Sequence, residues 1–264
     1  MFITLANLPN IMSAIYLLSY TRNIERMCAV AMRSCYSSKS ADELYLDPSF
    51  TEEDIKRMLA KSNELGHLDV LEHGSLTFSI TQVSRAFTHQ MVRYRLASFS
   101  QQSQRHIRVK ADRPWYVKPP SLTNQKYDEL MNQIVKVYDE LLLDASIKKE
   151  DARFVLPNAT MTNLTMSANP RELKHIFAQR CDPAAQWEIR RVVWGVFALS
   201  YLIAPNIFAS LDRPAGGIAE VQDKLKSTKE LVDLQRPTFN AMEYGGLFSL
   251  NIEDPELTLY ALKN

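Results

Sequence analysis

One stretch of the chain holds a marked excess of positive charge. Between His73 and Ala111 there is no Asp or Glu, although the whole chain is nearly neutral, with 31 Lys and Arg against 30 Asp and Glu. Fixed cations repel one another unless an opposite charge is present. The stretch therefore predicts an anion-binding site, and its cations are Arg85, Arg93, Arg95, Arg105, Arg108 and Lys110. A solvated basic helix face with a polar loop is the alternative that charge and periodicity leave open.

The order of residues in this stretch indicates how the cations are presented. Residues 76–80 alternate between apolar and polar side chains, which is typical of a half-buried strand. From residue 82 the spacing becomes helical, and Arg85, His89 and Arg93 recur every four residues. A polar loop over 98–105 follows. Arginine suits phosphate because its planar guanidinium donates two parallel hydrogen bonds. We therefore expect a strand, a helix and a loop that present arginines to a phosphate-bearing ligand.

The composition bounds the class of protein. The 264 residues are 46% hydrophobic and 23% charged, as in an ordinary globular protein of one large domain or two small ones. The near-zero net charge argues against a nucleic-acid-binding protein, and no apolar run approaches the roughly 20 residues of a membrane span. No basic segment precedes the first apolar residues, so no secretory signal is expected.

The cysteines and the absence of several sequence motifs limit which kinds of site the chain can contain. Cys28, Cys35 and Cys181 are too few and too scattered for a disulfide framework, which indicates a reducing cytoplasm. The chain contains no CxxC pair and no HExxH, so no metal site is predicted. It also lacks a GxGxxG after a strand and a P-loop, so any nucleotide cofactor must bind without the usual glycine-rich turns.

Several helices can be placed from their ends. Thr51, followed by three acidic residues, predicts a helix start, and Gly66 predicts its end. Asn169 followed by proline predicts another start, and Asp182 followed by proline predicts the next. Residues 127–142 carry a long apolar stripe, the strongest amphipathic pattern in the chain, and we expect that helix to serve packing.

A spaced motif in the basic stretch resembles that of a known family. Arg93-Tyr94-Arg95, seven residues and then Ser103 resemble the signature of the flavin-dependent thymidylate synthases (the ThyX family), which is Arg-His-Arg, seven residues and Ser. Tyr94 departs from the family's histidine at a position that faces flavin. Further blocks agree in order, and they are Leu71-Glu72-His73, SRAFTHQMVRYR, ARFVLPNATMT, the Asn169-x-Arg171 pair and the segment from Arg180 to Arg190. The resemblance covers about residues 25–200.

The resemblance implies a fold and an assembly. It implies an α+β fold, with a central, mostly antiparallel sheet packed with helices in a single domain over residues 1–264. The family core would span about residues 25–200, and a helical C-terminal extension about residues 205–264. The implied assembly is a homotetramer with FAD-bound active sites at subunit junctions.

The resemblance also assigns site residues by matching positions. For FAD these are His73, Ser75, Arg93, Tyr94, Arg95, Gln101, Asn169, Arg171 and His175. For deoxyuridine monophosphate (dUMP) they are Gln90, Arg93, Gln101, Ser103, Gln104, Arg105, Arg153 and Arg180. Arg180 matches the arginine placed against the uracil ring, where its charge would favour ionisation at N3. Without the resemblance, Arg153 would be interpreted as an ordinary surface residue.

The activity implied by the resemblance is a reductive methylation. The FAD-dependent enzyme would convert dUMP to thymidylate (dTMP), with 5,10-methylenetetrahydrofolate as one-carbon donor and NADPH as reductant. Cysteine-dependent synthases use a thiol nucleophile, but no cysteine of this chain lies in the signature or has a flanking catalytic pattern. A fixed arginine that stabilises negative charge on the ring is a substitute. Ser103 has no identifiable basic partner and is interpreted as a hydrogen-bonding group for the substrate.

Two alternatives remain at this point. One is a non-catalytic nucleotide-binding or RNA-binding protein that uses the same basic segment, which the near-neutral charge and the lack of an RNA-binding aromatic signature disfavour. The other is a flavin enzyme acting on another pyrimidine, for which Tyr94 is the only indication. Bound flavin absorption in the purified protein favours either enzyme over the binding protein.

Overall fold

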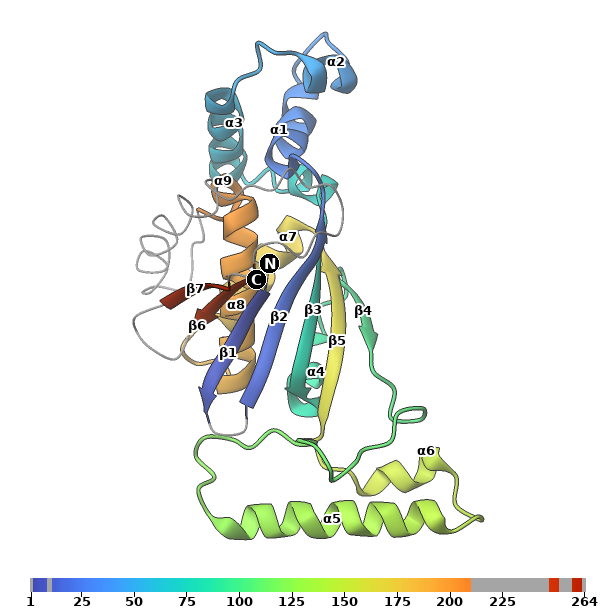
Figure 1. The fold of residues 1–264 in the computed structure, drawn as a ribbon. Helices are drawn as coiled ribbons and strands as arrows, with labels where there is room; N and C mark the ends of the chain where they lie inside the picture. The colour runs from blue at the N-terminus through green and yellow to red at the C-terminus, as the bar shows by residue number, and fades with distance from the viewer. Residues whose placement is uncertain (1, 9–10, 210–246, 252–257, 263–264) are drawn as a thin grey trace.

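An antiparallel sheet forms the centre of the chain. The computed structural model describes residues 2–8, 11–209, 247–251 and 258–262. Five strands pair in the order β1-β2-β3-β5-β4, with the bounds Phe2–Leu8, Ile11–Tyr20, Leu76–Ser84, Met161–Ala168 and Ser98–Gln101. Every pairing in this sheet is antiparallel. The predicted α+β fold with a central, mostly antiparallel sheet is confirmed (Figure 1).

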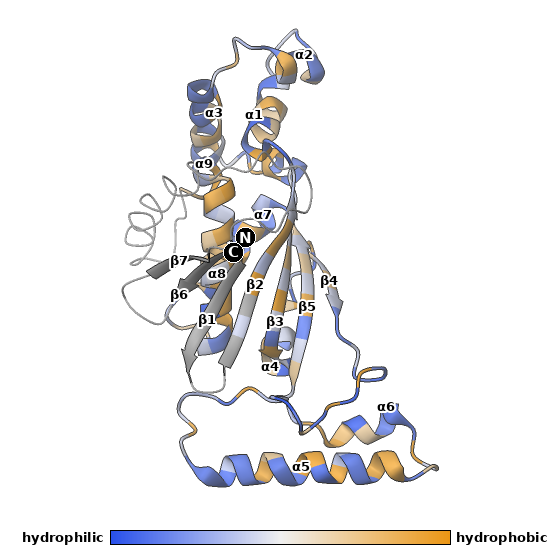
Figure 2. Cartoon of the chain, viewed as in Figure 1, coloured by the Kyte–Doolittle hydropathy of each residue, from blue (hydrophilic) through white to orange (hydrophobic). Residues whose placement is uncertain are grey.

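Alternation along β3 and a long apolar helix create the core. Leu76, Phe78 and Ile80 are fully buried, as their period-2 spacing predicts. Helix α8 (Trp187–Ile203) packs on β1, β2 and β3, and its central turns are apolar in Figure 2. A sheet face and a helix of this length bury apolar surface that neither could bury alone.

Three helices lie beyond the end of the sheet where β3 begins. They are α1 (Ile24–Ser34), α2 (Ala41–Leu46) and α3 (Glu52–Leu65), followed by the 3-10 helix η1 (Asp69–His73) (Figure 1). The predicted ends of α3 are confirmed, because Thr51 Oγ1 accepts from the Asp54 amide at 3.2 Å and Gly66 has a φ of 71°.

The opposite end of the sheet carries a separate helical layer. It contains α5 (Gln125–Leu143), α6 (Lys149–Ala152) and the 3-10 helix η2 (Arg153–Val155) (Figure 1). A second small core of Trp115, Met131 and Val135 holds α5 in place. The predicted packing role of this helix is confirmed for that side, but Leu130 and Val137 remain 50% and 44% exposed.

The segment after β5 contains one helix start that sequence reasoning placed correctly and one that it did not. Asn169 caps α7 (Pro170–Arg180) by accepting from the Glu172 amide at 2.8 Å, as predicted. Asp182 instead closes a local turn, with its Oδ1 accepting from the Ala184 amide at 2.8 Å. Helix α8 begins at Trp187, capped by Gln186.

The C-terminal extension differs from the helical segment expected there. A short helix, α9 (Pro205–Phe208), is followed in the described residues by two paired strands, β6 (Leu247–Asn251) and β7 (Thr258–Leu262). The helical expectation is therefore wrong for these strands, and residues 210–246 lie outside the described part of the chain. No described helix is both long enough and apolar enough to cross a bilayer.

Candidate active site

The register of β3 and β5 brings two candidate segments together. Leu76 pairs with Ala168 in antiparallel strands, so the residues before β3 lie beside those after β5. Gly74 lets the turn before β3 pack closely on α1, because a Cβ there would lie 2.4 Å from Ile24 Cγ1, whereas Pro170 Cδ at 3.6 Å would be in ordinary contact. A side chain at this position would require Ile24 to shift.

Four residues expected to bind FAD lie in these two segments, and they are His73, Ser75, Asn169 and Arg171. The segments are joined by an ion pair in which Arg171 donates to Glu72 Oε1 at 2.5 Å. The side chains of His73, Ser75 and Arg171 are exposed. The N-terminus of α7 adds a partial positive charge, so this corner of the sheet suits an anionic ligand.

The signature run Arg93-Tyr94-Arg95 follows α4 (Arg85–Met91) and alternates in direction. Arg93 and Arg95 are exposed, and neither side chain forms a hydrogen bond or ion pair with another described residue. Tyr94 is only 5% exposed. Two guanidiniums are therefore available to a ligand, while the ring between them is part of the core.

The Tyr94 hydroxyl connects this run to α7. It accepts a hydrogen bond from Arg180 Nε at 2.7 Å and donates one to Gln179 Oε1 at 2.8 Å. The Arg180 guanidinium carbon lies 5.6 Å from the Tyr94 ring centroid, and the His175 ring meets it edge-on at 5.7 Å. Burial raises the pKa of Tyr94, although the charge of Arg180 opposes that change. The phenol is therefore a neutral partner for Arg180.

Sequence reasoning placed Tyr94 at FAD, which stays a prediction, and the structure shows that its hydroxyl bonds to two residues of α7. Gln179, which joins Tyr94 to His175, was not anticipated at all. Its position one residue before Arg180 in the sequence gives no signal of this contact.

Four of the residues expected to bind dUMP, Gln101, Ser103, Gln104 and Arg105, lie at the C-terminal end of β4, in a segment that we call the substrate loop (101–105). Gln101 Nε2 donates to Thr88 Oγ1 at 2.9 Å, and Arg85 donates to the Gln102 carbonyl at 3.1 Å. The buried Arg85 Nε has no hydrogen-bond partner among the described residues. Burial lowers the pKa of Arg85, and the charge of Arg153 lowers it further. Arg85 thus holds the loop, a role that sequence reasoning did not give it.

Two predicted substrate arginines meet at one acidic residue. Arg105 pairs with the Glu150 carboxylate at 2.7 Å, and Arg153 Nε donates to the Glu150 carbonyl at 3.0 Å. Gln90 is turned toward its own helix, where its Nε2 donates to the Ala86 carbonyl at 3.1 Å. The structure therefore groups Arg105 with Arg153 at α6.

The two candidate sets lie toward different ends of the sheet. In the β4–β5 pair, Ser98 faces Ser167 and Gln101 faces Leu164. The start of β4 therefore lies toward α7, and the substrate loop leaves toward α6, as Figure 1 shows. Within one protomer, Arg105 and Arg153 thus lie beside α6, and Arg180 lies at the end of α7.

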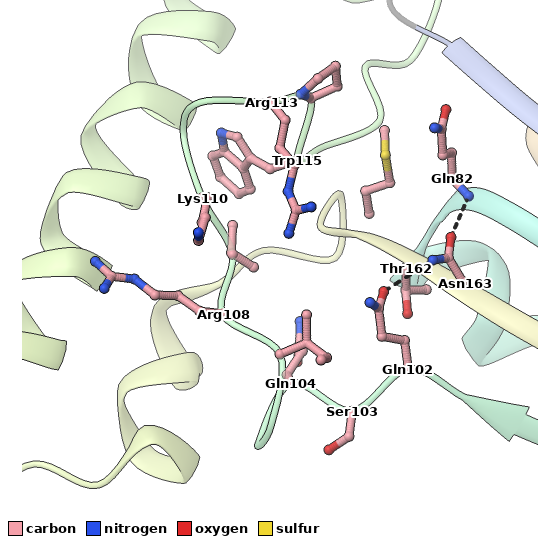
Figure 3. Close-up of a pocket in the computed structure, with 14 residues that line it drawn as sticks. Gln82, Gln102, Ser103, Gln104, Arg108, Lys110, Arg113, Trp115, Thr162 and Asn163 are labelled. Atoms are coloured by element: carbon pink, nitrogen blue, oxygen red, sulfur yellow. Dashed lines mark hydrogen bonds between the residues drawn. The ribbon is translucent and has the colours of Figure 1, made fainter.

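A hollow opens beside the substrate loop (Figure 3). Its lining includes Ser103, Gln104, Arg113, Trp115 and Asn163, and the Arg113 guanidinium points into it. Its volume of about 180 Å³ is smaller than the roughly 300–1,000 Å³ of pockets that enclose a ligand. The hollow has three cations in its lining, Arg108, Lys110 and Arg113, and it is too small to enclose a dinucleotide.

A buried carboxylic acid fixes the start of α4. Glu188 is 3% exposed and accepts from the Ser84 amide at 2.7 Å and from the Ser84 hydroxyl at 2.5 Å. The same hydroxyl accepts from the Phe87 amide at 3.0 Å. Burial raises the pKa of Glu188, and the two Ser84 hydrogen bonds oppose the change. Sequence reasoning missed this residue because a Glu in the first turn of a helix is usually exposed.

The two buried cysteines do not offer a nucleophile, and the third, Cys35, is exposed and lies outside the signature. Cys28 and Cys181 are buried, and burial raises the pKa of Cys28 to about 12 and that of Cys181 further. A thiol needs a lowered pKa to attack at neutral pH. Within the described part of the chain, no cluster of three His, Cys, Asp or Glu could hold a metal ion.

Comparisons with known proteins agree with one another. The family model described as thymidylate synthase complementing protein matches residues 16–206. A flavin-dependent thymidylate synthase of Geobacter sulfurreducens is 42% identical over 199 residues, covering 74% of this chain and 84% of that protein. One from Clostridium tetani is 37% identical over 212 residues, covering 73% and 84%.

The fold has a solved counterpart. The flavin-dependent thymidylate synthase ThyX from Helicobacter pylori, whose crystal structure is complexed with FAD and dUMP, superposes with a TM-score of 0.58 at 21% identity, over 69% of this chain and 91% of that one. Taken with the sequence matches, this likeness leaves one conclusion: the chain belongs to the family of flavin-dependent thymidylate synthases.

Proposed function

We propose that this protein converts dUMP to dTMP with FAD as bound cofactor, 5,10-methylenetetrahydrofolate as one-carbon donor and NADPH as reductant. The observation that carries the proposal is the signature run, in which Arg93 and Arg95 are exposed without a described partner on either side of a buried ring. Such guanidiniums are suited to phosphate groups. Family membership weighs against the non-catalytic alternative, and nothing in the structure favours another pyrimidine.

The residues at the α7 corner fit FAD. His73, Ser75, Asn169, Arg171 and His175 would hold the cofactor there, and Arg93, Tyr94, Arg95 and Gln101 complete the set that the signature implies. The exposed cations and the N-terminus of α7 complement a pyrophosphate without a glycine-rich loop. When bound, FAD supplies hydride transfer and the relay of the one-carbon unit.

The substrate loop and its neighbours would hold dUMP. Arg105, Arg153 and the Ser103 hydroxyl are donors for its phosphate, with Gln90, Arg93, Gln101 and Gln104 as further contacts. Arg180 would lie against the uracil ring, where a fixed positive charge stabilises negative charge at N3 and raises electron density at C5. The raised pKa values of the buried thiols support a route without a cysteine nucleophile.

The assembly we propose is a homotetramer with each site shared between protomers. Two observations support sharing. Arg105 and Arg153 lie toward α6, whereas Arg180 lies on α7. Apolar side chains beside the candidate residues are exposed, with Leu96 at 68% and Phe154 at 82%. Exposed apolar groups next to functional arginines are typical of an interface.

The three free cysteines fit the reducing cytoplasm that the composition predicts.

The test is an assay for thymidylate from dUMP, methylenetetrahydrofolate and NADPH, with and without added FAD. We expect product that depends on all three substrates and on flavin. A protein that binds FAD but forms no thymidylate would contradict the proposal. A colourless protein that cannot be reconstituted with FAD would return it to the binding-protein alternative.

A further inference from the structure

We propose that Tyr94 and Gln179 are positioning residues, which fix Arg180 and His175 through one directed chain of hydrogen bonds. The chain runs from Arg180 to Tyr94, to Gln179 and to His175. The inference rests on the proposed function, in which Arg180 faces the uracil ring and His175 contacts FAD. It adds a physical link between the two ligands, and it assigns a role to the tyrosine that replaces the family's histidine.

The direction of each hydrogen bond follows from the donors. Arg180 Nε–H can only donate, so the Tyr94 oxygen accepts it at 2.7 Å. The single hydroxyl proton then goes to Gln179 Oε1, 2.8 Å away. The other end of that amide, Nε2, can only donate, and it lies 3.3 Å from His175 Nε2. In the proposed chain His175 Nε2 is the acceptor, and the ring carries its proton on Nδ1.

The chain rests on rigid elements. Tyr94 is buried in the main core, and His175, Gln179 and Arg180 are all on α7, where residues four apart share a face. Nε is the only guanidinium atom of Arg180 that bonds to a described side chain, which leaves its two terminal nitrogens for a ligand. The neutral phenol orients the guanidinium without cancelling its charge. An imidazole is shorter than a phenol and would not place a polar atom where the Tyr94 hydroxyl lies.

The principal variant is Tyr94→Phe, which removes only the hydroxyl. Loss of a hydrogen bond to a charged group should lower kcat for thymidylate by roughly 10- to 100-fold. NADPH-driven flavin reduction without dUMP, measured per bound FAD, should fall by a much smaller factor than kcat, because that step does not require Arg180. Gln179→Leu, an exposed position, should lower kcat in the same direction by a smaller factor while leaving the fold intact.

The matched control is Tyr116→Phe. It also loses one hydroxyl hydrogen bond, to Asp128 Oδ1 at 2.7 Å, but this contact lies beside α5. We expect its kcat to be unchanged. The positioning role would be overturned if Tyr94→Phe had the wild-type kcat or lost no more kcat than the control. It would also be overturned if the loss of kcat were fully accounted for by a loss of bound flavin.

A second readout is independent of turnover. Nitrogen-15 NMR of the histidines should show His175 as the Nδ1–H tautomer in the wild type and a mixture of tautomers in Gln179→Leu. An Nε2–H tautomer in the wild type would contradict the hydrogen-bond chain even in an active enzyme. A correct tautomer in a protein that forms no thymidylate would instead reject the proposed function and retain the chain.

Discussion

Arg180 and Arg105 are held in opposite ways. Arg180 is oriented by a buried neutral phenol within one protomer. Arg105 pairs with the Glu150 carboxylate at the surface, where the two side chains are 58% and 39% exposed. An exposed ion pair contributes only about 0–1 kcal/mol and exchanges readily for another anion. The Tyr94 region is therefore ordered before a ligand binds. In the substrate loop, by contrast, Arg105 can exchange Glu150 for a phosphate group.

The largest effect is expected at Arg180. Arg180→Ala should lower kcat by roughly 100- to 1,000-fold, the usual loss when a preorganised charge-stabilising donor is removed. FAD should remain bound, which flavin absorbance per protomer will measure. Wild-type turnover in this variant would contradict the account, because the Tyr94 region would then have no catalytic role.

A smaller effect on binding is expected at Arg105. Arg105→Ala should raise the KM for dUMP by roughly 10- to 100-fold through loss of a charge-assisted hydrogen bond to phosphate, with a much smaller change in kcat. Arg108→Ala is the control, since Arg108 is in the same basic stretch but pairs with Asp139 at 2.8 Å. Equal effects in both variants would show a general loss of charge and not a specific contact.

Glu188 tests the connection between the Tyr94 region and the substrate loop. It fixes the start of α4, the helix that lies between Arg85 and the signature run. Its pKa is raised in the folded state, so the protonated carboxyl contributes stability that is present below its ordinary pKa of 4.5 and is lost as pH rises through the folded value. Relative to Glu188→Gln, the wild type should therefore lose unfolding free energy as pH rises over that interval. Urea unfolding of both proteins from about pH 4 to 8 measures the difference. Parallel pH profiles would contradict the raised pKa.

The smallest effect is expected at Glu150. Glu150→Gln releases Arg105 from its ion pair, so the KM for dUMP should fall by up to about threefold, in keeping with the small free energy of an exposed pair. Initial-rate kinetics at low salt will measure it. A rise in KM would mean that Glu150 positions Arg105 for phosphate and does not compete with it.

Local patterns predicted the parts of the structure that depend on local physics. The alternation of residues 76–80 predicted the buried face of β3, and Thr51 and Asn169 form the caps that their residue types favour. The acid-free stretch predicted exposed arginines, and Arg93 and Arg95 are exposed. These features depend on near neighbours in the chain.

The contacts that sequence reasoning missed depend on distant segments. Tyr94 and Gln179 are 85 positions apart, and no local spacing connects them. The Asp182 start was wrong because a side-chain-capped turn satisfies that aspartate locally, while Gln186 Oε1 accepts from the amides of Glu188 and Ile189 at 3.0 and 3.1 Å and caps the helix. The roles of the candidate site residues remain predictions from the motif.

The measurement that tests the shared site most directly is subunit complementation. Arg180→Ala and Arg105→Ala, each nearly inactive alone at low dUMP, are unfolded, mixed in equal amounts and reassembled. If each site takes Arg180 from one protomer and Arg105 from another, random assembly restores about a quarter of wild-type activity, because half of each contribution is intact. Activity in the mixture no higher than in either variant alone would contradict the account, since it would place both arginines of a site in the same chain.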